Sequence, residues 1–193
     1  MVMVPMSSTD FSVQDKDHAL RTARESIQHG LTHGMALSVD TTVFSDNLRQ
    51  TLACFVTLHK DNQLRGCIGS LKAHQPLIKD IAEHAFAAAF QDPRFPPLSQ
   101  SEFDALDIDI SVLSKPAPMT FTNEEDLLTQ IQPFTDGLIL EHGYHRGTFL
   151  PSVWEQLPEK KAFLNQLKVK AGLSSDWWHD DVKISRYETI MFE

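Results

Sequence analysis

The residues of this sequence that are best suited to chemistry lie in one short segment, residues 64–69, which read Leu-Arg-Gly-Cys-Ile-Gly. The segment has the character of a β-strand, yet it contains two glycines three residues apart. Glycine inside a strand often marks a place where a ligand, another chain segment or a bulge comes close to the backbone. Cys67 stands between the glycines, and Arg65 stands just before them. Because a cation beside a thiol favours the nucleophilic thiolate, Cys67 is a candidate reactive cysteine.

The pairing of this segment with the strand before it decides which side chains surround Cys67. A two-residue loop pairs Val56 with Cys67, whereas a three-residue loop pairs Thr57 with it. In the second register His59 lies opposite Arg65, on the same polar face as the thiol. A slip of one residue exchanges the two faces, and we favour the three-residue loop because it gathers the apolar and thiol side chains on one face. That face would carry Leu52, Cys54, Val56, Leu58, Leu64 and Ile68.

Two interpretations of the polar face follow. In the catalytic one, Cys67 is a nucleophile or redox centre, Arg65 stabilises its thiolate or holds an anion, and His59 acts as the base. In the structural one, Cys67 is a small residue that fills a tight space, and Arg65 pairs with a carboxylate such as Asp92. Cys54 belongs to the apolar face and is predicted to be a core residue.

Histidine pairs are the next candidates for chemistry. His29 and His33 stand four residues apart in a predicted helix. His142 and His145 stand three residues apart in a predicted turn. Neither pair has a third or fourth partner at the spacing of a zinc site, so we interpret them as surface histidines and predict no metal site. The sequence has no phosphate-binding loop, dinucleotide fingerprint or serine nucleophile elbow, and no cofactor is expected.

Composition and charge exclude several classes of function. Of the 193 residues, 41% are hydrophobic and 22% are charged, which is ordinary globular usage and excludes a disordered or fibrous protein. The formal net charge of −9 opposes non-specific binding of nucleic acid and docking on an anionic membrane. The sequence shows no signal-peptide pattern, no apolar run of the roughly 20 residues that a membrane span needs, and too few cysteines for a disulfide framework. We therefore expect a cytoplasmic protein with reduced thiols.

The elements that must position these residues alternate between helices and antiparallel hairpins. Helices are predicted over residues 12–34, 76–90 and 160–173, and capping boxes at Ser99 with Glu102 and at Thr122 with Glu125 begin two shorter ones. Strands are predicted over residues 52–59, 64–69, 107–113, 137–141, 147–150 and 182–187. Residues 1–11 are a predicted tail, and residues 37–50 are a predicted extended loop. This order predicts an α+β fold without a doubly wound parallel sheet.

A short internal repeat points to two related halves. Arg65-Gly66-Cys67 in the first hairpin corresponds to Arg146-Gly147-Thr148 in the second, and a proline and then a helix follow each hairpin. We interpret this shared order as the trace of a duplication within one domain that spans residues 12–190. The halves would cover about residues 12–118 and 119–190.

These segments together resemble the AMMECR-type domain, a family named for a human region of Alport syndrome, midface hypoplasia and elliptocytosis. The matching segments are residues 64–69, 87–98, 110–113, 136–140, 147–154 and 170–173. The resemblance implies a compact α+β fold with an antiparallel, partly barrel-like sheet, built from two related hairpin-and-helix halves and flanked by helices. It also implies the bacterial or archaeal branch known as the AmmeMemoRadiSam set, whose members accompany a MEMO-like protein and a radical S-adenosylmethionine enzyme.

Two functions are open at this point, beside a purely structural role of the motif, and the resemblance gives no residue a catalytic role. The chain is either a thiol-dependent enzyme or enzyme subunit that acts with the MEMO-like protein and the radical S-adenosylmethionine enzyme, or a non-catalytic binding or scaffold module whose glycine-rich strand forms a partner or ligand groove. The candidate catalytic residues are Cys67, Arg65 and His59. The candidate ligand-binding or partner-binding residues are Gly66, Gly69, Asp92, Arg94 and Lys170.

Overall fold

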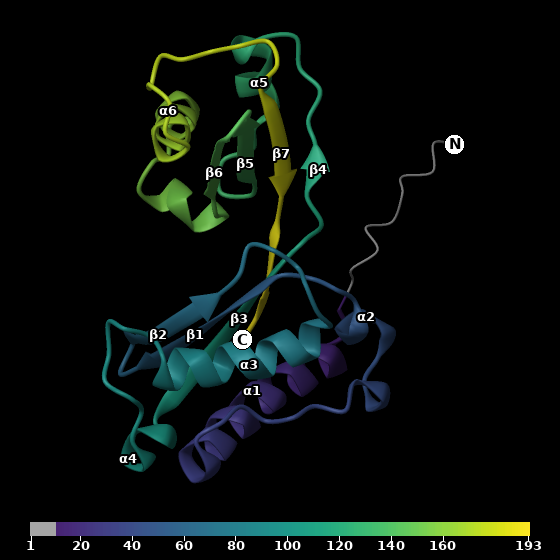
Figure 1. Cartoon of the computed structure of the whole chain (residues 1–193), viewed down its shortest axis with the longest axis vertical. Helices are drawn as coiled ribbons and strands as arrows, with labels where there is room; N and C mark the ends of the chain where they lie inside the picture. Colours follow the sequence, from purple (N-terminus) through teal and green to yellow (C-terminus); the bar gives the residue numbers. More distant parts are fainter. Residues whose placement is uncertain (1–10) are drawn as a thin grey trace. The chain divides into compact units, whose positions relative to one another are not determined.

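Two antiparallel sheets of four strands each, with helices packed against them, make up the structure (Figure 1). The computed structural model describes residues 11–193, so the predicted tail of residues 1–11 lies almost entirely outside the described part. The described chain divides into two units, residues 11–113 with 190–193 and residues 114–189. The predicted α+β class is confirmed, whereas neither sheet closes into a barrel within the described residues. No helix of the described chain combines the length and the apolar character that crossing a membrane requires.

The first unit carries the motif strand at the edge of its sheet. Its strands are β1 (Cys54–Lys60), β2 (Gln63–Gly69), β3 (Leu106–Leu113) and β8 (Thr189–Phe192), in the order β2-β1-β3-β8. Its helices are α1 (Val13–His33), α2 (Asp46–Arg49), α3 (Leu77–Phe90) and α4 (Gln100–Phe103), with a 3₁₀ turn, η1 (Thr41–Val43), before α2. Because β2 has a strand on one side only, one row of its backbone groups faces away from the sheet.

Helix α3 covers one face of this sheet, and α1 lies alongside α3 (Figure 1). Alternate residues of β1, Cys54, Val56 and Leu58, are fully buried in the core that α3 and α1 share with the sheet. Helix α3 contributes small residues such as Ala85 and Ala88 to this core. Because side chains alternate along a strand, the residues between them point to the opposite face of the sheet.

The turn between β1 and β2 has two residues, not the three that we favoured from the sequence. Asp61 and Asn62 both have positive φ angles, 52° and 60°. This is the geometry of a type I′ turn, whose twist matches that of the flanking strands. Asparagine and aspartate tolerate the left-handed region better than most residues, which explains their presence here.

A bulge in β2 then restores part of the register that we favoured. Thr57 pairs with Cys67, as predicted, but His59 pairs with Leu64. Arg65 has no partner in β1 and is the extra residue of the bulge. Leu64 is therefore 41% exposed instead of joining the apolar face. The predicted polar face is wrong at Arg65, which does not lie opposite His59. A bulge redirects the side chain of its extra residue.

The second unit has the same kind of hairpin. Its strands are β4 (Ala117–Pro118), β5 (Gly137–His142), β6 (His145–Phe149) and β7 (Lys183–Tyr187), in the order β4-β7-β5-β6. Its helices are α5 (Glu124–Gln130) and α6 (Lys160–Lys170), with a 3₁₀ turn, η2 (Pro151–Glu155). Its core includes Trp154, whose ring stacks on Phe163 with centroids 3.7 Å apart.

The glycine of the internal repeat packs against a helix in both units. Gly66 lies in β2 and Gly147 in β6, and each strand is at the edge of its sheet. A Cβ atom added to Gly66 would lie 2.2 Å from the carbonyl oxygen of Ala88 in α3. A Cβ atom added to Gly147 would lie 2.9 Å from the carbonyl oxygen of Leu167 in α6. In each unit the glycine lets a helix backbone lie directly on the edge strand.

Two local predictions are wrong for reasons of capping. The predicted loop of residues 37–50 contains η1 and α2, because Ser45 accepts a hydrogen bond from the backbone of Leu48 and starts a helical turn. Helix α5 is capped by Asn123 rather than Thr122. The short strands β4 and β8 were not predicted, since segments of two and four residues carry too little alternation.

Candidate functional site

Cys67 lies on the face of its sheet that points away from α3. Its neighbour Gly66 faces Ala88 of α3, and successive residues of a strand point to opposite faces. The Thr57 hydroxyl donates a hydrogen bond to Cys67 Sγ at 3.3 Å, and Asp109 of β3 pairs with Thr57 on the other side. Cys67, Thr57 and Asp109 thus form a row across three strands, with the thiol partly exposed.

The loop after α3 holds the outer edge of β2 at Cys67. The Asp92 carboxylate accepts hydrogen bonds from the backbone N–H of Cys67 at 2.9 Å and from the Arg94 guanidinium at 2.7 Å. Arg94 Nη2 also lies 3.4 Å from the carbonyl oxygen of Cys67. The Arg94 hydrogen bonds, followed by the backbone N–H of Cys67, hold the pKa of Asp92 far below its usual range, although burial opposes them. Asp92 is buried, whereas 54% of the Arg94 side chain is exposed.

Arg65 is anchored beside α4. Its Nε donates a hydrogen bond to Glu102 Oε1 at 2.9 Å, and its Nη2 donates one to the carbonyl oxygen of Pro96 at 2.9 Å. Arg65 Nη1 is buried without a hydrogen-bond partner in residues 11–193, and the guanidinium lies 5.8 Å from the ring centroid of Phe95, within cation–π range. The Arg65 hydrogen bond is the largest cause that lowers the pKa of Glu102, to about 2. The bulge thus turns Arg65 into a structural anchor.

His59 is engaged away from the thiol. Its Nδ1 lies 3.0 Å from Asp109 Oδ2, and no hydrogen bond joins it to Cys67 within the described chain. The expected arrangement of His59 as a base beside Cys67, opposite Arg65, is therefore not formed. The structural alternative, in which Arg65 pairs with a carboxylate, agrees with the structure, but the carboxylate is Glu102 and not Asp92, which binds Arg94.

Other parts of the same chain lie close to the backbone of the two motif glycines. Gly66 lies against the backbone of Ala88, as described above. A Cβ atom on Gly69 would lie 2.4 Å from the Phe55 ring and 2.5 Å from the carbonyl oxygen of Cys54. Both glycines are therefore required by internal packing, and neither needs a bound ligand to explain it.

The motif lysine belongs to the second unit. Lys170 is an exposed residue of α6, with its ammonium 4.9 Å from the ring centroid of Phe149. The buried lysine of this helix is Lys168, whose Nζ donates a hydrogen bond to Glu124 Oε1 at 2.9 Å. We did not single out Lys168 from the sequence, although it lies on the apolar stripe of the predicted helix, where a lysine is unusual.

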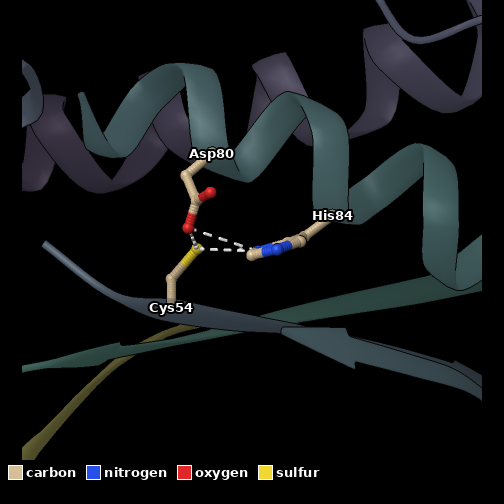
Figure 2. A group of neighbouring side chains, drawn as sticks. All are labelled: Cys54, Asp80 and His84. Atoms are coloured by element: carbon tan, nitrogen blue, oxygen red, sulfur yellow. Dashed lines mark hydrogen bonds and ion pairs between the residues drawn. The ribbon is translucent and has the colours of Figure 1, made fainter. Parts of the chain in front are cut away.

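A second thiol, Cys54, lies on the other face of the sheet with two polar side chains of α3 (Figure 2). Its Sγ is 3.5 Å from Asp80 Oδ2 and 3.6 Å from His84 Nδ1, and these last two atoms are 3.3 Å apart. Burial, followed by the neighbouring Asp80, raises the pKa of the Cys54 thiol well above its usual value. Burial lowers the pKa of His84, although Asp80 opposes this shift.

Sequence reasoning placed Cys54 in the core, which is confirmed, but it missed these partners. Asp80 and His84 stand four residues apart in a helix, a spacing that puts two side chains on one face. Cys54 is 26 residues from Asp80, and only the tertiary fold brings them together. The spacing of Asp80 and His84 was the one signal available in the sequence.

The architecture is shared with known proteins. A family model described as AMMECR1 matches residues 20–192. Protein MJ0810 of Methanocaldococcus jannaschii is 35% identical over 186 residues, which cover 94% of this chain and 91% of that protein. A protein of Thermotoga maritima is 37% identical over 163 residues, covering 83% and 88% of the two chains. The crystal structure of the uncharacterized protein PH0010 from Pyrococcus horikoshii matches with a TM-score of 0.74 and 32% identity, covering 90% of this chain and 88% of that chain.

Proposed function

This chain belongs to the AMMECR1 family, and we propose that it is a binding module whose motif strand offers Cys67 and Arg94 to a partner protein. One observation carries the proposal. The special residues of the motif, Gly66, Gly69 and Arg65, are fixed by packing and hydrogen bonds within the chain, whereas Cys67 is partly exposed and 54% of the Arg94 side chain is exposed. The part of the motif that another molecule can contact is therefore the surface formed by Cys67 and Arg94.

The surroundings of Cys67 favour binding over nucleophilic catalysis. A cysteine nucleophile needs a base within hydrogen-bond distance and a group that orients this base. Among the described residues, the side-chain hydrogen bond of Cys67 comes from the Thr57 hydroxyl, and the nearby imidazole of His59 is held by Asp109. A thiol-dependent enzyme is the second candidate, because Arg94 supplies a cation next to the Cys67 backbone.

A pocket also lies beside the same strand, near the β1–β2 turn. It has a volume of about 350 Å³ and is lined by Lys60, Asp61, Gln63, Leu64, Arg65 and Glu102. Charged groups of both signs surround it, and Leu64 adds an exposed apolar side chain. A mixture of one apolar anchor and a charged rim is typical of protein–protein surfaces. The proposed partners are those that the family resemblance implies, a MEMO-like protein and a radical S-adenosylmethionine enzyme.

Alkylation of Cys67 tests the proposal. We expect N-ethylmaleimide to modify one thiol of the folded chain, because Cys54 is fully buried and Cys67 is not. The bulky adduct would occupy the binding surface and weaken partner binding at least about tenfold. Isothermal titration calorimetry with the MEMO-like protein, and separately with the radical S-adenosylmethionine enzyme, measures this effect.

The matched control is the Cys67→Ser chain treated with the same reagent, which should keep the affinity of the untreated variant. Equal binding by modified and unmodified wild-type chains would show that the Cys67 surface is not the interface. Absence of binding to both proteins would remove the proposed partners.

A further inference from the structure

Three side chains meet between β1 and α3: Cys54 from the strand, and Asp80 and His84 from the helix. Their geometry is that of a zinc site, and we propose that Cys54 Sγ, Asp80 Oδ2 and His84 Nδ1 bind a zinc ion. The ligand atoms lie within 4.8 Å of one another. Tetrahedral zinc has bonds of about 2.3 Å to sulfur and about 2.0–2.1 Å to nitrogen and oxygen, which places S about 3.5–3.6 Å from both N and O, and N about 3.3–3.4 Å from O. The three distances in this chain are 3.6, 3.5 and 3.3 Å.

The orientation of His84 separates a metal site from a catalytic triad. In a cysteine–histidine–aspartate triad, one ring nitrogen of the histidine faces the nucleophile and the other faces the carboxylate. In this chain the same atom, His84 Nδ1, faces both the Cys54 thiol and the Asp80 carboxylate (Figure 2). Three ligand atoms thus converge on one point, where a cation satisfies all of them.

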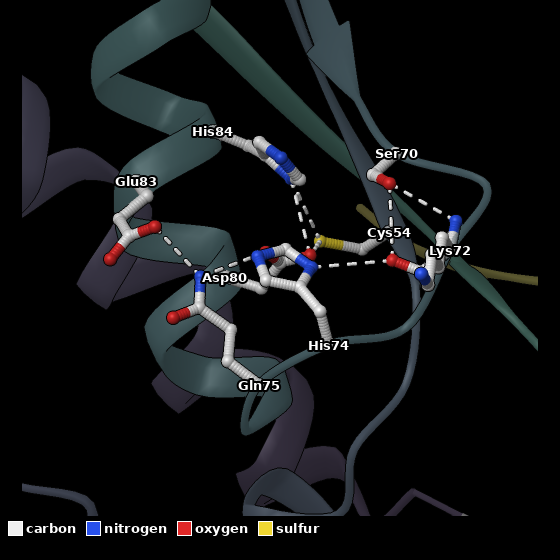
Figure 3. Close-up of polar contacts among 8 residues, drawn as sticks. All are labelled: Cys54, Ser70, Lys72, His74, Gln75, Asp80, Glu83 and His84. Carbon is white, nitrogen blue, oxygen red and sulfur yellow. Dashed lines mark hydrogen bonds and ion pairs between the residues drawn. The ribbon is translucent and has the colours of Figure 1, made fainter.

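Neighbouring groups orient the Asp80 carboxylate. Gln75 Nε2 donates a hydrogen bond to Asp80 Oδ1 at 3.0 Å, which leaves Oδ2 for the thiol and the imidazole (Figure 3). Gln75 also bonds to Glu83 at 2.7 Å, which fixes the amide in this orientation. Outer groups that orient a ligating carboxylate are a regular feature of metal sites.

A second imidazole stands beside the carboxylate. His74 Nδ1 lies 3.3 Å from the Lys72 carbonyl oxygen, which can only accept a hydrogen bond, so the proton of a neutral His74 is on Nδ1 (Figure 3). Its Nε2 lies 3.6 Å from Asp80 Oδ1. His74 is not one of the three proposed ligands, and it lies beside the carboxylate of the ligand Asp80.

Burial and protonation suit a bound divalent ion. Cys54 and Asp80 are buried, whereas the side chains of His84 and His74 are 14% and 49% exposed. An ion can therefore reach the site from the side of the two histidines. Zinc binding displaces the Cys54 thiol proton to solvent, and the ion compensates the buried Asp80 charge.

Metal titration of the full chain tests the proposal. We expect the metal-free protein to bind one equivalent of Zn²⁺, measured against a chelator of known affinity. The Cys54→Ser and His84→Gln variants should lose at least about 100-fold in affinity, since even the loss of an outer group costs metal sites 10- to 100-fold. Cys67→Ser is the matched control, because it removes the other thiol of the chain and should bind Zn²⁺ as the wild type does.

Co²⁺ identifies the ligands directly. We expect Co²⁺ in the wild-type chain to show an intense thiolate-to-metal absorption band, which Cys54→Ser abolishes and Cys67→Ser retains. His84→Gln, with its folding checked by circular dichroism, covers the case in which Cys54→Ser does not fold. A wild-type chain that binds neither ion, a band that follows Cys67, or a folded His84→Gln variant with unchanged affinity would overturn the proposal. The test is independent of partner binding, since it uses the isolated chain.

Discussion

Replacement of Gly66 by alanine is expected to destabilise the first unit by about 3 kcal/mol or more. The added Cβ atom would lie 2.2 Å from the Ala88 carbonyl oxygen, so α3 must move away from β2. A backbone atom cannot rotate aside as a side chain can, and the displaced helix also carries Ala85 and Ile81 of the core. Urea denaturation followed by circular dichroism measures the loss of unfolding free energy.

Gly34→Ala is the control for this prediction. Gly34 ends α1 with a φ of 71°, and a Cβ atom there would meet nothing within 4 Å. Alanine at this position costs only the left-handed backbone conformation, about 1 kcal/mol. If Gly66→Ala cost no more than Gly34→Ala, the helix would not rest on Gly66 as described.

Replacement of Glu102 by glutamine is expected to cost about 2 kcal/mol of stability at pH 7. The variant leaves the buried Arg65 guanidinium without its anionic partner, and it weakens the bond to Ser99 that starts α4. Glu141→Gln is the control, because its pair with Arg146 lies on the surface of the second unit and should cost well under about 1 kcal/mol.

The same pair predicts a dependence on pH. The pKa of Glu102 is lowered from 4.5 to about 2 in the folded chain, so its contribution is fully present above about pH 4.5 and is lost as the pH falls toward 2. The stability difference between wild type and Glu102→Gln should therefore shrink over this range. A difference that stays constant from pH 7 to pH 2 would show that the carboxylate charge does not stabilise the fold.

The sequence allowed the local part of the fold to be predicted. Alternation of apolar residues located β1 and β3, and the glycine Gly34 located the end of α1. The pairing of Thr57 with Cys67 was predicted from the same alternation. The bulge at Arg65 was not, because a type I′ turn followed by an extra residue gives the same apolar pattern as a longer loop.

The site was predicted less completely, because its partners are distant in sequence. Glu102 is 37 residues from Arg65, and Asp92 is 25 residues from Cys67. A sequence pattern shows that Arg65 needs an anion but not which carboxylate the fold brings to it. The resemblance to a family placed Asp92 and Arg94 with the motif, whereas the partners of Cys54 had no such guide.

We propose that Cys67 contributes to a surface for a partner and takes no part in a reaction. The most direct measurement is the affinity of Cys67→Ala for the proposed partners, compared with that of the wild type by isothermal titration calorimetry. We expect an affinity within about threefold of the wild type, because alanine leaves the surface open and removes only a small side chain. Loss of the complex, or of a partner-dependent activity, in a folded Cys67→Ala chain would show that the thiol itself is required and would contradict the claim.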